Sequence, residues 1–446
     1  MNYPSSLVYL NSFLNLERIQ WKPDNRLWNL KRMRVLLDWF DHPEKDFYSV
    51  VIAGTKGKGS TGFFLESILR EAKTRVGFYS SPHLEDPRER IRIQGALISP
   101  ALWTQGIECI HKKLISKRIP GEMGDFTYFE IMTLLAALSF QKAKIKVGIF
   151  EVGMGGRLDA TRALASRLVL LTPIHLDHQE FLGNTIARIA GEKAAVIPRG
   201  ADVIVSPQLP EAQKVIERFV HKKKAHLWKV RPVSFPVGLE GDYQRTNAGA
   251  AVIAAKLTLQ ALTPTLSQRE TGSSKMTITQ RETGSSQIPL SPQGRGKGEG
   301  AEPLALKALQ KSNWPGRFEI FKGRPTYILD GAHNPASVVA LTAYLKKKYP
   351  RRDCLLIFGT SRDKNSAQML KTLSGYFYDI IVTRSASPRS QEIGTLLAEA
   401  RGKFCRVMAA GSVPEALRLA KNLADKVVIT GSFYLIGDAR KYVKQG

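Results

Sequence analysis

The chain has 446 residues, of which 43% are hydrophobic and 24% charged, and its formal net charge is +27. The length predicts two domains, and the composition excludes disorder of the whole chain. No apolar run approaches the ~20 residues that span a bilayer, so we expect no membrane partner, and the evenly spread basic residues disfavour specific nucleic-acid binding.

The first predicted strand, residues 47–54 ("FYSVVIAG"), leads through a glycine-rich turn into a predicted helix over residues 60–72. Such a turn aims backbone N–H groups and the helix N-terminus at an anion. A structural turn needs one glycine, whereas this turn has three glycines, two lysines and hydroxyl side chains. The pattern predicts a nucleotide phosphate site in which Lys58 contacts the phosphates and Ser60 ligates Mg²⁺. Its residues are Gly54, Thr55, Lys56, Gly57, Lys58, Gly59, Ser60 and Thr61.

Further buried strands are predicted over residues 75–81, 146–153 and 167–174, with a helix over residues 127–143. This alternation predicts an α/β fold with a mainly parallel sheet.

Polar side chains stand where two of these strands end. Glu151 closes one apolar strand, where a carboxylate is costly unless it is paired or bound to a metal. His175, Asp177 and His178 follow the other strand. A single histidine of this kind is more often structural. Two of them with an aspartate, beside a predicted phosphate site, indicate a metal site.

One segment differs from the rest. Residues 263–302 are rich in Ser, Thr, Gly and Pro and contain "QRETGSS" twice, so they predict a disordered surface insert. A second alternating series follows, with strands predicted in "TYILDG", "CLLIFGT", "YDIIVTR" and "VVITGSFY". It predicts a second, smaller α/β domain.

Seven motifs together resemble one known family. They are "GTKGKGST", "YSSPHL" with "ERIRI", "TYFE", "EVGMGGRLDAT", "LDHQEFLGNTIARIAGEKAAVI", "NWPGRFE" and "LDGAHNP". They occur in the order seen in folylpolyglutamate synthases and the bifunctional dihydrofolate/folylpolyglutamate synthases, relatives of the Mur ligases. The resemblance covers nearly the whole chain apart from the insert, and it accounts for a hydroxyl residue two positions after Lys58.

The resemblance implies a P-loop-containing, mainly parallel-sheet ATPase domain over residues 1–316, followed by a smaller Rossmann-like α/β glutamate ligase domain over residues 317–446. It implies an ATP-dependent amide ligase that adds L-glutamate to dihydropteroate and to the γ-carboxylate of reduced folates through an acyl phosphate. The spelling of "TYFE" and "SPHL" is similar to that of the bacterial bifunctional enzymes, so we expect both activities.

The resemblance also implies the roles of individual residues. Lys58, His178 and Lys193 are expected to be catalytic. Ser60 and Glu151 are expected to ligate one Mg²⁺, and His178 with a carbamylated Lys193 a second. The expected ATP contacts beyond the loop are Asn247, Arg317, Asp330 and His333, and the expected pterin or folate contacts are Ser81, Pro82 and His83. The family often has Asn where this chain has Arg162, which could retune the acceptor cleft.

Three alternatives share part of this pattern. A Mur-type ligase of cell-wall synthesis usually places a UDP-binding domain before the loop, and here 53 residues precede Gly54. A generic P-loop kinase would lack "NWPGRFE" and "LDGAHNP". A basic nucleic-acid-binding ATPase is suggested by the net charge alone.

The three scattered cysteines fit a reducing cytosol, and we expect a cytoplasmic monomer.

Overall fold

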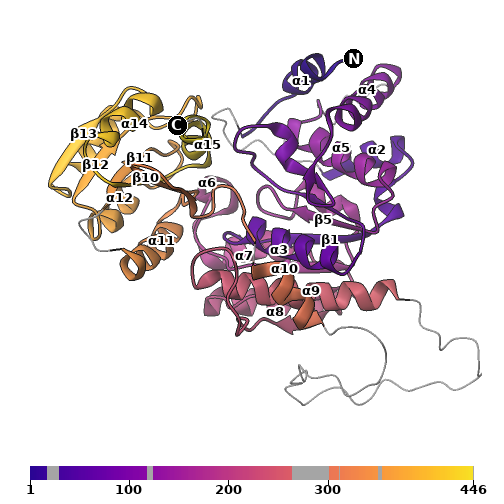
Figure 1. Cartoon of the computed structure of the whole chain (residues 1–446). Helices are drawn as coiled ribbons and strands as arrows, with labels where there is room; N and C mark the ends of the chain where they lie inside the picture. The colour runs from indigo at the N-terminus through magenta and orange to yellow at the C-terminus, as the bar shows by residue number, and fades with distance from the viewer. Residues whose placement is uncertain (18–29, 118–123, 264–300, 311, 350–353, 445–446) are drawn as a thin grey trace, which may run out of the picture.

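The structure is a computed structural model, and it describes residues 1–17, 30–117, 124–263, 301–310, 312–349 and 354–444 (Figure 1). Most of the predicted insert, residues 264–300, lies outside the described residues. Ala301 and Glu302, which we expected in the insert, instead begin helix α10 (Ala301–Gln310).

The first sheet has eight strands among the described residues, in the order β4-β3-β2-β5-β1-β6-β7-β8. All neighbouring pairs are parallel except β2 with β3 and β3 with β4. In chain order the strands are β1 (Tyr48–Ala53), β2 (Val76–Tyr79), β3 (Ile91–Ile93), β4 (Ala96–Leu97), β5 (Val147–Glu151), β6 (Leu168–Leu171), β7 (Asp202–Val205) and β8 (His226–Lys229).

Helices cover both faces of this sheet because its central strands are apolar on both sides. Val50 and Ile52 of β1 face one core, and Val51 and Ala53 face the other. The first core is closed by α3 (Lys58–Glu71), α9 (Tyr243–Leu262) and α10. The second is closed by α1 (Tyr3–Asn11), α2 (Leu30–Trp39), α4 (Pro100–Ser116), α5 (Tyr128–Lys142), α7 (Ile186–Ala194) and α8 (Pro210–Lys223).

The short helical segments lie in the connections between these elements. They are η2 (Pro43–Asp46), η3 (Pro87–Arg90), η5 (Ala160–Leu164) and α6 (Gln179–Leu182).

The second sheet has six strands in the described part of the chain, in the order β13-β12-β11-β14-β10-β9, and only β9 is antiparallel to its neighbour. Its strands are β9 (Glu319–Phe321), β10 (Thr326–Asp330), β11 (Leu355–Phe358), β12 (Asp379–Val382), β13 (Arg406–Ala409) and β14 (Lys426–Thr430). Its helices are α11 (Pro335–Lys348), α12 (Ser366–Ser374), α13 (Ile393–Ala400), α14 (Val413–Lys421) and α15 (Phe433–Val443).

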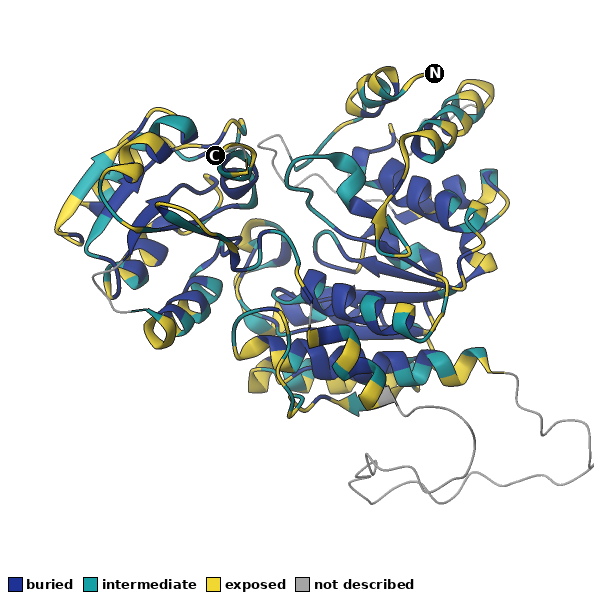
Figure 2. Ribbon diagram, viewed as in Figure 1, coloured by how far each residue is buried: buried dark blue, intermediate teal, exposed yellow. Residues whose placement is uncertain are grey.

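The central strands of the two sheets form separate buried layers, dark blue in Figure 2, and the exposed residues lie on the outer faces of the helices, in the connecting loops and on edge strands. The predicted α/β fold with mainly parallel sheets is confirmed. The exact boundary between residues 316 and 317 stays a prediction. No helix among the described residues has both the length and the apolar character needed to cross a membrane.

The register of the first sheet brings the predicted site together. Ile52 lies beside Glu151, and Ala53 lies beside Leu171. The carboxyl ends of β1, β5 and β6 therefore meet at one edge, where ligands bind in open α/β sheets.

Candidate active site

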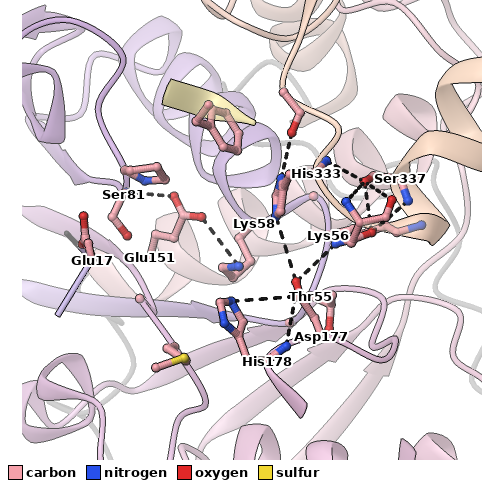
Figure 3. Close-up of a pocket in the computed structure, with 18 of the residues that line it drawn as sticks. Glu17, Thr55, Lys56, Lys58, Ser81, Glu151, Asp177, His178, His333 and Ser337 are labelled. Atoms are coloured by element: carbon pink, nitrogen blue, oxygen red, sulfur yellow. Dashed lines mark hydrogen bonds and ion pairs between the residues drawn. The ribbon is translucent and has the colours of Figure 1, made fainter. Parts of the chain in front are cut away.

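A cavity of about 520 Å³ lies at this edge and is lined by residues from both domains (Figure 3). It brings together seventeen of the residues predicted from sequence: Gly54, Thr55, Lys56, Gly57, Lys58, Ser60, Ser81, Pro82, Glu151, His175, Asp177, His178, Lys193, Asn247, Arg317, Asp330 and His333. Gly59, Thr61 and His83 are not among the described residues that line it. The roles of all these residues stay predictions.

The glycine-rich turn is held in place from the end of β6. The N–H groups of Thr55 and Lys56 donate to the carbonyl of Pro173 at 3.0 and 3.3 Å. A Cβ on Gly54 would lie 1.9 Å from the Thr172 hydroxyl oxygen, so only glycine fits there. Helix α3 starts at Lys58 and has no side-chain cap. Its first N–H groups are therefore available to an anion in the cavity.

Glu151 faces this helix start from the end of β5. The carboxylate is 4% exposed, and its Oε1 lies 3.9 Å from the Lys58 Nζ. The Ser81 N–H donates to the other oxygen at 3.3 Å. Burial raises the pKa of Glu151, although Lys58 and Arg317 oppose this shift. The buried carboxylate has only a long ion pair with Lys58, and a bound cation would reduce the cost of burying its charge.

Lys193 is a buried amine on α7, 4% exposed. Burial, followed by the positive charge of Lys58, lowers the pKa of Lys193 to about 7. In a fraction of the molecules, the Lys193 amine is therefore uncharged near neutral pH. Burial and Lys364 likewise lower the pKa of His178 to about 3, so its imidazole is neutral.

Asp177 joins the two domains at the centre of the cavity. Its Oδ1 accepts a hydrogen bond from the Lys364 Nζ at 2.8 Å, and its Oδ2 accepts one from the Asn334 Nδ2 at 3.2 Å. Burial opposes ionisation, but His178, Lys364 and His333 lower the pKa of Asp177 well below its usual range. Burial and Lys364 lower the pKa of His333 to about 4. Both histidines are then neutral at pH 7, and Asp177 forms its ion pair with Lys364.

Arg317 brings a second positive charge from the C-terminal side. Its guanidinium lies over the ring of Phe433, 4.6 Å from the centroid. Its Nε is buried and has no hydrogen-bond partner among the described residues. A Cβ on Gly59 would lie 3.7 Å from the Arg317 Nη2, so the guanidinium stands directly opposite the phosphate loop.

Two further predicted ATP contacts have partners of their own. The Asn247 amide donates to the Gln244 side chain at 2.9 Å, and its oxygen would be 2.5 Å from a Cβ on Gly57. Asp330 accepts from the N–H groups of Phe318 and Ala332, both at 3.0 Å. Asp330 therefore fixes backbone next to the cavity, whereas Asn247 is held by another side chain.

The remaining part of the cavity is more apolar. Its apolar side chains include Phe129, Met154, Leu158 and Phe181. Ser81 and Pro82 line it, whereas the His83 Nδ1 accepts a hydrogen bond from the buried Arg90 Nε at 2.8 Å. Arg90 also forms an ion pair with Glu17 at 2.5 Å. His83 is thus held by Arg90 and does not line the cavity.

Sequence reasoning missed several charged residues of the cavity, among them Glu17, Lys364 and Arg389. Lys364 lies in "GTSRDKN", directly after the buried strand β11. Charged residues that follow a strand of the second domain could therefore have indicated this part of the cavity. Glu17 carries no local signal of this kind. No group of three or more His, Cys, Asp or Glu side chains in the described ranges could hold a metal ion. The predicted metal sites are of a different kind, because their ligands include a serine and a lysine.

Comparison with known proteins agrees with this geometry. Residues 316–433 match the family model described as Mur ligase, glutamate ligase domain. The chain is 31% identical to the dihydrofolate synthase/folylpolyglutamate synthase of Bacillus subtilis, over 93% of this chain and 95% of the relative.

Solved structures match over the whole length. The Mycobacterium tuberculosis folylpolyglutamate synthase complexed with ADP and AMPPCP gives a TM-score of 0.79 at 26% identity, covering 99% of each chain. The E. coli FolC in complex with DHPP and ADP gives 0.76 at 26% identity, covering 100% of this chain and 98% of that one. These findings do not favour the cell-wall ligase or the nucleic-acid-binding ATPase. The chain belongs to the dihydrofolate synthase/folylpolyglutamate synthase family of ATP-dependent ligases.

Proposed function

We propose that this chain joins L-glutamate to dihydropteroate and to the γ-carboxylate of reduced folates while consuming ATP. One observation carries the proposal: the uncapped start of α3, with Lys58, faces the buried Glu151 in a cavity that both domains line. The names of the relatives support the choice of acceptors. Hydroxide is a poor leaving group, so the acceptor carboxylate must first be phosphorylated by ATP, and the acyl phosphate then reacts with the amine of glutamate.

The chain's own side chains supply the positive charge that phosphoryl transfer needs, because this chemistry depends mainly on positioning and on neutralising charge. We place the ATP phosphates on residues 54–61, with Lys58 and Arg317 on opposite sides of them. Asn247, Asp330 and His333 surround the nucleotide in this proposal. The contact of Asp177 with Lys364 holds the domains together over the cavity, which keeps water from the acyl phosphate.

Mg²⁺ fits the donors on the N-terminal side of the cavity. We place one ion on Ser60 and Glu151, and a second on His178 and Lys193. When bound, these ions would neutralise the phosphate charge and fix its geometry. His178 is uncharged near pH 7, as a ligand imidazole must be.

Lys193 suits the second ion only if its amine becomes anionic. A protonated lysine would repel Mg²⁺, whereas the nitrogen of a neutral amine can form a bond to the carbon of CO₂ and release a proton to solvent, which leaves an anionic carbamate. The pKa of about 7 makes the neutral amine available. We therefore propose that Lys193 is carbamylated in the active enzyme.

The first test is a direct assay. Purified protein with Mg-ATP and L-glutamate is given either dihydropteroate or tetrahydrofolate, and phosphate release and product mass are measured. We expect a product one glutamate heavier with each acceptor. Turnover with tetrahydrofolate alone would remove the dihydrofolate synthase half, and no turnover with either would contradict the proposal.

A second test addresses the metal ligands. Glu151→Gln and Lys193→Ala should both abolish most turnover, and acetate should partly restore Lys193→Ala by replacing the carbamate. Lys214→Ala, an exposed site on α8, is the matched control. Normal turnover of Lys193→Ala would disprove the carbamate.

We also propose a cytoplasmic monomer, and size-exclusion chromatography at the mass of one chain tests its oligomeric state.

A further inference from the structure

The loop that carries Ser81 and Pro82 continues to a second contact outside the cavity, with the last helix of the C-terminal domain. The Leu84 side chain packs in the core that includes α15. A Cβ on Gly437 of α15 would lie 2.3 Å from the Leu84 carbonyl oxygen. A Cβ on Gly316 would lie 2.8 Å from Ile436 and 3.2 Å from Leu84. The interface around Leu84 therefore has no room for one more methyl group.

Charged side chains fix the same contact. The Glu85 carboxylate accepts hydrogen bonds from the Arg440 Nη1 at 2.5 Å and from the Lys444 Nζ at 2.8 Å. The Nε of Arg440 donates to the Glu319 carboxylate of its own domain at 2.9 Å. Arg440 is thus held by β9 and presents its remaining donors to the loop.

The loop is stiff enough to transmit a displacement from this contact. The Glu89 carboxylate accepts hydrogen bonds from the N–H groups of Leu84 and Glu85 at 2.7 and 3.1 Å. At its other end, the Ser81 N–H donates to Glu151 (Figure 3). A shift of Leu84 would therefore move Ser81 and its neighbour Pro82 at the cavity wall.

We propose that Gly437 and Arg440 are positioning residues for the acceptor. They hold residues 81–86 where Ser81 and Pro82 form part of the acceptor wall, although neither is among the described residues that line the cavity. The inference rests on the proposed function, which assigns this wall to the pterin or folate. Through Ser81, the same contact supports the position of Glu151.

The rest of the domain interface decides which part moves when the contact is overpacked. Asp177 separately joins the domains through Lys364 and Asn334. An added methyl group at position 437 therefore displaces the short loop more easily than the whole domain. The acceptor should suffer more than the nucleotide.

The test compares Gly437→Ala with Gly394→Ala. Both glycines lie in helices of the C-terminal domain, and a Cβ at position 394 would meet nothing within 4 Å. We expect Gly437→Ala to raise the KM for tetrahydrofolate and dihydropteroate by about tenfold and to lower kcat, with the KM for ATP within about twofold of wild type. Gly394→Ala should match wild type.

Glu85→Gln is a second variant that keeps the shape of the loop and removes its charge, in case Gly437→Ala folds poorly. It should raise the acceptor KM in the same direction. If wild type turns over and Gly437→Ala behaves as Gly394→Ala does, the inference fails alone. Equal increases in the KM for ATP and for acceptor would assign the contact to domain docking and overturn it. If wild type uses neither acceptor, the proposed function fails first and the inference falls with it.

Discussion

Lys364 of the C-terminal domain donates a hydrogen bond to Asp177 of the N-terminal domain at 2.8 Å, across 187 positions of sequence. Both side chains are nearly buried, with 10% and 7% exposure. Removing one partner of a buried ion pair leaves the other charge unpaired, which costs about 3 kcal/mol or more. Because this pair spans the domains, Lys364→Met should lower turnover and favour an open arrangement with a larger radius of gyration.

Small-angle scattering and turnover check this prediction, with Lys371→Met on the exposed side of α12 as control. Asp177→Asn combined with Lys364→Met should cost less than the sum of the single variants, because the two charges are coupled. The pKa of Asp177 is lowered in the folded state. The pair's contribution is therefore present above the unfolded carboxyl pKa and is lost as the pH falls through the folded value. An unchanged radius and turnover in Lys364→Met would contradict the role.

Gly57 gives a prediction for the phosphate loop. It has a φ of 82°, and its Cβ would lie 2.5 Å from the Asn247 oxygen. Gly200 has a similar φ of 70° with nothing within 4 Å of an added Cβ, so Gly200→Ala carries only the backbone strain, about 1 kcal/mol.

We expect Gly57→Ala to weaken ATP binding by tenfold or more, on the order of 1.4 kcal/mol, and Gly200→Ala to bind ATP as wild type does. Titration with a fluorescent ATP analogue measures both. Equal affinities of the two variants would show that the approach of Gly57 to Asn247 is not needed for the nucleotide.

Local features of the fold and site could be predicted, and long-range ones could not. The turn at residues 54–61 is recognisable because its glycines, lysines and flanking strand are contiguous. The place of β1 between β5 and β6 depends on pairing between distant segments, which local periodicity does not encode. The same holds for Lys364 opposite Asp177. The sequence predicts His83 in the acceptor wall beside Ser81 and Pro82, but its hydrogen bond with Arg90 depends on a neighbour that no spacing rule identifies.

The repeat insert gives a prediction for stability. Helix α9 ends at Leu262 and α10 begins at Ala301, so the two helices bracket the segment. Loop closure costs only about 0.6 kcal/mol for each doubling of loop length. Replacing residues 264–300 with a short Gly/Ser linker should leave turnover and the melting temperature close to wild type. Loss of folding or of turnover would show that the segment contributes to the structure.

Lys56 gives a pH dependence that can be separated from the other charges of the loop. Burial lowers the pKa of Lys56 to about 8, although Asp177 opposes this shift. The side chain is therefore charged below about pH 8 and neutral above it. Because ATP is anionic, its affinity should be highest below this pH and should fall by up to about tenfold per pH unit above it.

Arginine stays charged throughout this range, so Lys56→Arg should remove the loss of affinity near pH 8. ATP titrations from pH 6.5 to pH 9.5 on both proteins measure the difference. A Lys56→Arg profile that falls at the same pH as wild type would assign the titration to another group.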